Sequence, residues 1–200
     1  MSTVEFIFDF GSPNAYFTHQ VLPGLATEHG ASVTIKPVLL GGLFKITGNQ
    51  APWAAYQGIK GKMEYEMLEI RRFIEKHGLT KYRLNPHFPV NTVTLMRGAL
   101  VAERDGFLDT YVDAGLRMMW EDGLDMADKE VFVTAMTDAG FDGAQLLADA
   151  ETPEIKQLLI EKTQDAADRG AFGVPTFFVG SQMFFGKERL GQVGDALSNI

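Results

Sequence analysis

The stretch Phe8-Asp9-Phe10-Gly11-Ser12-Pro13-Asn14-Ala15-Tyr16 marks the point where one element ends and another begins. The apolar run at residues 4–8 predicts a β-strand that leads into it. Ser12 can cap a helix, and Pro13 suits the first helical position because the N–H that proline lacks is unpaired there. A helix N-terminus that follows a strand in this way is a suitable binding site for an anion such as a phosphate, a carboxylate or a thiolate. Taken alone, however, Ser12 is explained by capping.

Composition narrows the class of protein. The 200 residues are 46% hydrophobic, which fits one compact domain, or one domain with a large insertion. The net charge of −8 disfavours nucleic acid and anionic membranes as partners. No apolar run is long enough to span a bilayer, and the first residues lack the basic and apolar regions of a secretion signal. We therefore expect a cytoplasmic protein.

The chain contains no cysteine. It can form no disulfide of its own, and it offers no thiol nucleophile or thiolate metal ligand. The four histidines fall at no metal-ligand spacing, so no metal site is expected. Gly-x-Gly-x-x-Gly and Walker-type loops are absent as well, so a nucleotide cofactor is not indicated.

The order of elements outlines the architecture. Residues 4–8 and 31–38 read as strands around a helix that contains Pro23 and ends at Gly30, which makes a βαβ unit with parallel strands. Residues 41–169 show helical periodicity and almost no strand pattern. We expect helices near residues 63–74, 93–100, 108–119, 128–139, 144–150 and 153–168, with Asn91 or Thr92 able to cap the second of these.

The C-terminal segment returns to strands. Residues 173–180 and 182–186 predict a hairpin, and residues 187–197 predict a closing helix. The chain therefore reads as βαβ, a helical block and ββα. The simplest assembly is an α/β fold with a four-stranded mixed sheet and a large all-helical insertion.

This arrangement, with Val174-Pro175-Thr176 before the third strand, resembles a thioredoxin-like fold of the DsbA type. In that family the corresponding proline is cis and faces the N-terminus of the first helix. The resemblance implies a thioredoxin-like domain at residues 1–40 and 170–200 and a helical insertion at 41–169. Within the family the chain resembles the 2-hydroxychromene-2-carboxylate isomerases and, more distantly, the kappa-class glutathione transferases. The shared pieces are the stretch quoted first, Gly48-Asn49, Phe88-Pro89-Val90-Asn91-Thr92, Gly170-Ala171-Phe172-Gly173-Val174-Pro175-Thr176-Phe177-Phe178 and Phe185-Gly186-Lys187-Glu188-Arg189-Leu190.

Redox members of the family carry Cys-x-x-Cys where this chain has Ser12-Pro13-Asn14-Ala15. The resemblance implies that glutathione, as cofactor, supplies the missing sulfur. Ser12 would then be the catalytic residue, and it would donate to the glutathione thiolate rather than attack. A helix N-terminus and a hydroxyl donor lower the pKa of a thiol from about 8.5 toward neutrality.

The resemblance also implies further cofactor contacts. Asn49 would meet the glycine end of glutathione, and the main chain of Val174, beside Pro175, would pair with the cysteinyl backbone. Lys187 and Glu188 would lie at the γ-glutamyl end, although the family often has serine at the position of Lys187. Each has an ordinary alternative: Asn49 is a typical turn residue, Val174 a core valine and Glu188 a favourable first-turn acid.

The second substrate would be an aromatic enone lying over the thiol. A lysine and an asparagine would bind its pyruvate carboxylate and carbonyl, and aromatic side chains would form the walls. The ordinary alternatives are that Lys62 pairs with Glu66 on a solvated helix face, that Tyr65 packs, and that Asn91 caps its helix. The candidates are Trp53, Lys62, Tyr65, Phe88, Asn91 and Thr92.

The implied reaction interconverts 2-hydroxychromene-2-carboxylate and trans-o-hydroxybenzylidenepyruvate, as in the breakdown of naphthalene-type aromatics. Relatives in this family are commonly homodimers, so we expect one here. Three alternatives stay open: a kappa-like glutathione transferase or peroxidase, a non-catalytic thioredoxin-fold binding module, and an isomerase that acts on another enone.

Overall fold

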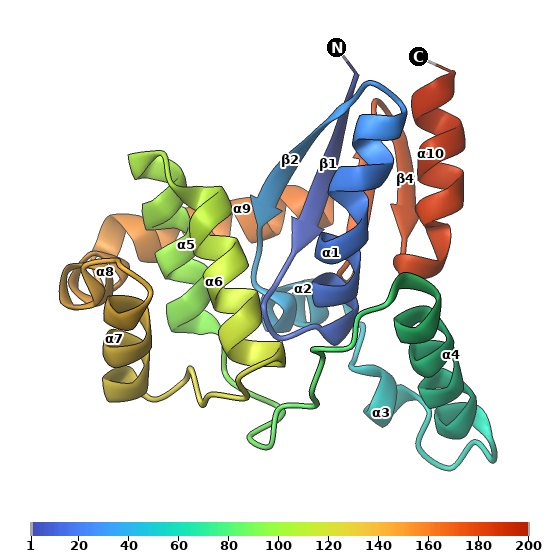
Figure 1. The fold of residues 1–200 in the computed structure, drawn as a ribbon. Coiled ribbons are helices and arrows are strands. Elements are labelled where there is room, and N and C mark those ends of the chain that lie inside the picture. The colour runs from blue at the N-terminus through green and yellow to red at the C-terminus, as the bar shows by residue number, and fades with distance from the viewer. Residues whose placement is uncertain (1, 200) are drawn as a thin grey trace.

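A computed structural model describes residues 2–199. Its centre is one four-stranded sheet with the order β2-β1-β3-β4 (Figure 1). β1 runs parallel to β2, with Val4 opposite Val33, whereas β1–β3 and β3–β4 are antiparallel. The predicted mixed sheet is therefore confirmed. The strands are β1 (Thr3–Phe8), β2 (Ser32–Pro37), β3 (Thr176–Val179) and β4 (Gln182–Phe185).

Two helices belong to the sheet-forming parts of the chain. α1 (Pro13–Glu28) begins at the Ser12 turn, and α10 (Leu190–Ser198) packs against it. A short 3₁₀ helix, η1 (Lys187–Arg189), precedes α10, so the predicted closing helix is α-helical only from Leu190. Gly30 follows α1 with a φ of 64°, a backbone conformation that glycine adopts without steric cost.

The block between β2 and β3 is helical, as expected. The sequence did not predict α2 or α3, because α2 begins with Leu-Gly-Gly and α3 has only four residues. The helices are α2 (Leu40–Thr47), α3 (Pro52–Ala55), α4 (Lys62–His77), α5 (Val93–Asp105), α6 (Leu108–Trp120), α7 (Lys129–Asp138), α8 (Gly143–Ala150) and α9 (Pro153–Asp168).

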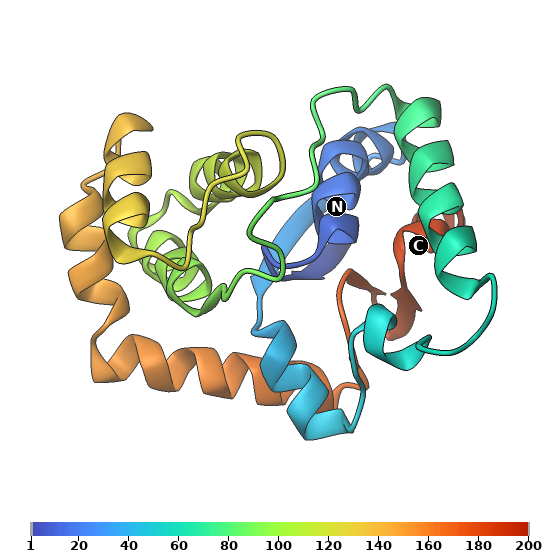
Figure 2. The same cartoon turned by 90° about the horizontal axis from the view of Figure 1, so that it is seen from below.

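The helical block divides into two parts in space. Helices α5 to α9 pack on one another beside the sheet, whereas α4 lies against α1 (Figures 1 and 2). The ring of Phe73 on α4 is 6.0 Å from that of Phe17 on α1. Both views place the end of the sheet that carries the α1 N-terminus between these two parts. The domain limits at residues 40/41 and 169/170 stay a prediction.

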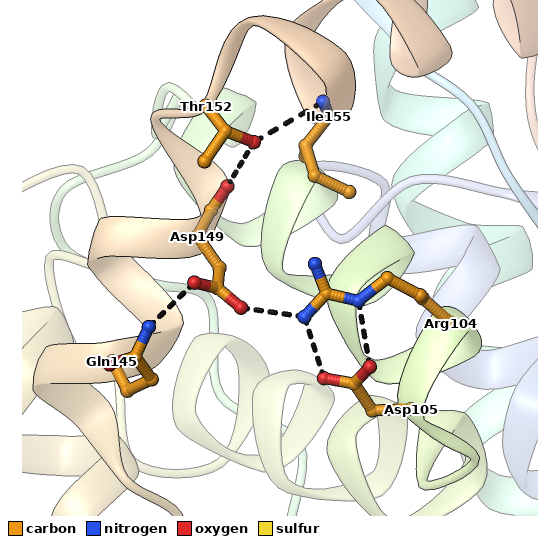
Figure 3. A network of polar contacts seen from close by, with 6 residues as sticks. All are labelled: Arg104, Asp105, Gln145, Asp149, Thr152 and Ile155. Carbon is orange, nitrogen blue, oxygen red and sulfur yellow. Dashed lines mark hydrogen bonds and ion pairs between the residues drawn. The ribbon is translucent and has the colours of Figure 1, made fainter.

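A polar network joins the far helices of the block (Figure 3). Arg104, near the end of α5, contacts Asp105 at 2.7 Å and Asp149 of α8 at 2.6 Å. Thr152 caps α9, since its hydroxyl accepts from the Ile155 N–H at 3.4 Å and donates to the Asp149 carbonyl at 2.8 Å. This cap resembles the Ser12 cap in geometry and lies in a different part of the molecule.

The two faces of β1 enter different apolar clusters, because successive side chains of a strand point to opposite faces. Phe6 and Phe8 belong to the large core shared with α1, α5 and α6. Ile7 belongs to a smaller cluster that contains Leu43 and Val174. The Val174 side chain is thus a core residue, and this anchors the chain just before Pro175.

Candidate functional site

Ser12 caps α1 from the end of the turn that follows β1. Its hydroxyl accepts from the Ala15 N–H at 3.3 Å and donates to the Val174 carbonyl at 3.4 Å, and the residue is 5% exposed. Hydroxyl-to-carbonyl bonds are usually 2.5–3.0 Å long, so the contact with Val174 is weak. The hydroxyl proton is therefore available to a better acceptor at the positive end of α1.

The loop before β3 faces this hydroxyl. The Val174–Pro175 bond is cis, as the family resemblance implied. The Pro175 carbonyl accepts from the Gly186 N–H at 2.9 Å, which ties the loop to the start of η1. Within residues 2–199 the Val174 N–H donates to no group, and its carbonyl receives only the long Ser12 bond. The Val174 main chain thus offers a donor and an acceptor to an extended ligand.

Asn49 lies on the other side of the same loop. Its amide Nδ2 donates to the Phe172 carbonyl at 2.8 Å, two residues before Val174. Gly48, with a φ of 71°, ends α2 and turns the chain so that Asn49 reaches this position. The structure thus brings Asn49 to the loop, and a glutathione contact for it stays a prediction.

The other two predicted cofactor residues follow β4. The Lys187 side chain is only 2% exposed, and its ammonium is paired with the Glu188 carboxylate and lies 5.7 Å from the Phe73 ring. Glu188 itself is half exposed. Of these two side chains, the Glu188 carboxylate is the one accessible to a ligand, and the buried ammonium was not foreseen from the sequence.

Asp9 is a buried carboxylate that the sequence did not single out as functional. It is 1% exposed and accepts from the Gly11 N–H at 2.8 Å, the Leu40 N–H at 2.7 Å and the Thr92 hydroxyl at 2.6 Å. Burial raises the pKa of Asp9, and the three hydrogen bonds oppose that shift. The available signal was an acid within the run Phe8-Asp9-Phe10, where a charge needs partners.

The predicted substrate residues fall into two sets. In the first, the ring of Trp53 lies edge-on to Phe88 at 5.0 Å, and Phe88 lies 5.9 Å from Trp120. The indole N–H of Trp120 donates to the Phe10 carbonyl at 2.8 Å, which connects this aromatic group to the turn. Thr92 is buried at the N-cap position of α5, and its hydroxyl already donates a hydrogen bond to Asp9.

Asn91 and the two α4 residues are more open to solvent. Asn91 accepts from the Val93 N–H at 3.0 Å, so its side chain contributes to the first turn of α5. Lys62 pairs with Glu66 at 3.0 Å, as its helical spacing predicts, and this hydrogen bond raises the Lys62 pKa. Tyr65 is 52% exposed. Their substrate contacts stay predictions.

Within residues 2–199 no group of histidine or acidic side chains could hold a metal ion, and no helix is both long and apolar enough to cross a membrane.

A mixed β2-β1-β3-β4 sheet whose first helix begins opposite the loop before β3 defines a thioredoxin-like protein, here one with serine at the turn and no cysteine. The chain belongs to the DSBA-like thioredoxin domain family, whose model matches residues 3–198.

Comparison with known proteins refines this class and confirms the resemblance. The chain is 27% identical to a 2-hydroxychromene-2-carboxylate isomerase of Sphingobium xenophagum, over 94% of each chain. It is 24% identical to human glutathione S-transferase kappa 1, over 94% of this chain and 87% of the relative. The solved structure of a 2-hydroxychromene-2-carboxylate isomerase superposes with a TM-score of 0.84 at 24% identity, covering 98% of this chain and 95% of that one.

Proposed function

We propose that this protein is a glutathione-dependent isomerase that interconverts 2-hydroxychromene-2-carboxylate and trans-o-hydroxybenzylidenepyruvate. The observation that carries the proposal is the Ser12 hydroxyl, which faces the Val174 carbonyl beside a cis-proline in a chain without cysteine. The isomerase relatives, which match nearly the whole chain, support the reaction type. The kappa-class relatives support glutathione as the cofactor.

The residues at the turn fit a thiol peptide. When bound, glutathione supplies a thiolate nucleophile whose reversible addition to the conjugated carbon of the ring-opened enone permits rotation about the former double bond. The Ser12 hydroxyl would donate a hydrogen bond to the sulfur in place of its weak bond to the Val174 carbonyl, and the α1 N-terminus would favour the thiolate anion. The Val174 N–H, which has no partner among the described residues, and the Val174 carbonyl would hold the cysteinyl backbone by strand-like pairing.

The second substrate would lie beside the Ser12 turn, on the side that the helical insertion, residues 41–169, approaches. Trp53 and Phe88 would contact its phenol ring, and Lys62 and Asn91 would bind the pyruvate carboxylate and carbonyl. Tyr65 and Thr92 complete the proposed wall. Positioning the enone over the sulfur would convert a bimolecular encounter into an oriented attack.

The direct test measures turnover of 2-hydroxychromene-2-carboxylate by the purified protein with and without glutathione. We expect isomerisation that depends on glutathione and saturates with it. Equal turnover without glutathione would contradict the proposal, because the chain supplies no sulfur nucleophile of its own. Oxidised glutathione, which has no free thiol, is the matched control and should not support turnover.

The kappa-class relatives favour a second candidate function, glutathione transfer or peroxidase activity. Chlorodinitrobenzene and cumene hydroperoxide, assayed beside the chromene, separate the two candidates. A transferase consumes one glutathione for each conjugate formed, whereas an isomerase leaves the glutathione concentration unchanged. A non-catalytic binding module would turn over none of these compounds, and an isomerase for another enone would show glutathione-dependent isomerisation only with a different substrate.

We also propose that the protein acts as a homodimer in the cytoplasm, in the catabolism of naphthalene-type aromatics. The resemblance to the isomerases supports the pathway, and exposed apolar side chains of the helical block, such as Met67 and Ile160, offer surface for an interface. Analytical ultracentrifugation tests the dimer, for which we expect twice the mass of the 22.1 kDa chain.

A further inference from the structure

We propose that Asp9 is the positioning residue of the site, and that it sets the Ser12 turn for a thiol by joining the turn to the starts of α2 and α5. The inference rests on the proposed function, because the ligand concerned is glutathione bound at Ser12. The preference of the site for a free thiol over a blocked one depends on where the Ser12 hydroxyl points.

Asp9 first fixes the turn itself. Its Oδ1 accepts from the Gly11 N–H at 2.8 Å, and its main-chain carbonyl accepts from the Ser12 N–H at 3.2 Å. An aspartate that binds the amide two residues further on imposes a defined turn. Two successive amide groups, including that of Ser12, are therefore oriented by one residue.

The same carboxylate reaches two other segments. Oδ2 accepts from the N–H of Leu40, the first residue of α2, at 2.7 Å. Leu39, the N-cap residue of α2, has an apolar side chain that cannot accept this bond, so Asp9 caps the helix from outside. Oδ1 also accepts from the hydroxyl of Thr92, at the N-cap position of α5, at 2.6 Å.

These contacts leave little freedom at the turn. A buried carboxylate is tolerated only when it is paired, and Asp9 lies at the positive ends of α2 and α5. A Cβ atom on Gly11 would lie 3.3 Å from Asp9 Oδ1 and 3.4 Å from Thr92 Cγ2. The turn, α2 and α5 are thus packed around one carboxylate, and a change at any of these contacts moves Ser12.

The consequence for binding is selective. The Ser12 hydroxyl meets the sulfur, whereas the Val174 main chain and Glu188 would meet other parts of glutathione. Displacing the turn should therefore reduce affinity for the thiol form and leave the rest of the binding energy in place. S-methylglutathione keeps the peptide but has no thiol proton to lose, so it reports the remaining contacts alone.

The test measures dissociation constants of glutathione and S-methylglutathione by calorimetry for the wild type, Asp9→Asn and Thr92→Val. The control is Thr163→Val, which removes a buried hydroxyl that accepts from the adjacent Leu39 N–H at 3.0 Å without touching Asp9. The preference is the ratio of the S-methylglutathione and glutathione dissociation constants. We expect it to fall about tenfold in Asp9→Asn, which removes a charged hydrogen-bond acceptor, and about threefold in Thr92→Val, which removes one hydrogen-bond donor. It should stay unchanged in Thr163→Val and return in Thr92→Ser.

An unchanged preference in Thr92→Val, whether or not both ligands bind more weakly, would overturn the inference. Thr92→Val decides the question even if Asp9→Asn does not fold, because valine keeps the shape of threonine. Amide hydrogen exchange gives a ligand-free readout: the Gly11 N–H should lose protection in Asp9→Asn and Thr92→Val but keep it in Thr163→Val. A wild type with no preference for glutathione would contradict the proposed function instead, and the exchange data would still judge the role of Asp9.

Discussion

Two parts of the candidate site differ sharply in burial. The Ser12 seat, which we define as Asp9, Ser12, Thr92, Val174 and Pro175, is buried and connected by hydrogen bonds. The arm, residues 52–66, carries Trp53 at 48% exposure, with Lys62 paired to Glu66 at the surface. A buried, bonded seat is ordered before a ligand arrives, whereas exposed side chains can adapt. The seat therefore suits a constant cofactor, and the arm suits the choice of electrophile.

The largest expected effect comes from Ser12→Ala. Removing the hydroxyl that we propose as hydrogen-bond donor to the sulfur should lower isomerase kcat/KM by about 100- to 1,000-fold. The lost cap should cost about 1 kcal/mol of unfolding free energy. Steady-state kinetics and urea denaturation measure the two effects.

Thr152→Ala is the matched control for this substitution. It removes a cap with the same pattern, an acceptor 3.4 Å from the Ile155 N–H, from a helix outside the seat. Thr152→Ala should lose similar stability with unchanged kinetics. If the two variants lost activity equally, capping alone would explain Ser12.

Crowding the seat should have the next largest effect. Gly11→Ala places a methyl group 3.3 Å from the Asp9 carboxylate, which its hydrogen bonds prevent from moving aside. We expect a loss of about 1–2 kcal/mol in stability and a fall in glutathione affinity of about tenfold. Gly24→Ala, in α1 with open space around its Cβ, should instead stabilise by up to about 1 kcal/mol and bind glutathione normally. Tolerance of Gly11→Ala would show that the seat is not rigid.

The arm should give smaller and more selective effects. Lys62→Gln removes the proposed partner of the substrate carboxylate and should raise the KM of the chromene about threefold, with the KM of glutathione unchanged. Glu66→Gln breaks the same 3.0 Å ion pair but keeps the ammonium, so it should leave the chromene KM unchanged or lower it. Equal effects of the two variants would assign Lys62 to the surface ion pair alone.

The smallest expected effect tests whether a loss of global stability, caused by a substitution far from the seat and the arm, changes isomerase activity. Hydrogen bonds from Lys156 and Lys129 lower the pKa of Glu151 from 4.5 to about 2. The lowered pKa contributes stability that is fully present above pH 4.5 and is lost as the pH falls toward 2. Because the group is about one third exposed, Glu151→Gln should cost less than about 1 kcal/mol at pH 7, and this cost should disappear as the pH falls through the folded pKa of about 2. Isomerase kinetics at pH 7 should not change; altered kinetics would show that remote stability reaches the site.

Local signals predicted the order of elements well. Pro13 at the start of α1, and Gly30 with a positive φ after it, gave correct element ends. The sequence missed α2 because its first residues are Leu-Gly-Gly and because the carboxylate that caps it, Asp9, lies 31 residues before Leu40. The pairing of Asp9 with Thr92 spans 83 residues and leaves no local pattern.

Burial was also difficult to infer from the sequence. Lys187 reads as a surface residue, yet its ammonium is enclosed beside Glu188 and Phe73. The sequence indicated Ser12 because a strand, a capping residue and a proline follow one another there. It indicated Val174 because Val174-Pro175-Thr176 resembles the family motif before the third strand. Neither local sequence patterns nor family motifs predict side-chain contacts between residues far apart in the sequence.

The central claim is that the Ser12 seat holds a thiol sulfur, which the chain itself lacks because it has no cysteine. The most direct measurement is a crystal structure of the protein with glutathione. The account predicts the sulfur about 3 to 3.5 Å from Ser12 Oγ, as expected for a hydrogen bond to sulfur. It also predicts that the cysteinyl backbone pairs with the Val174 main chain. Glutathione with its sulfur bound away from Ser12 would contradict the account.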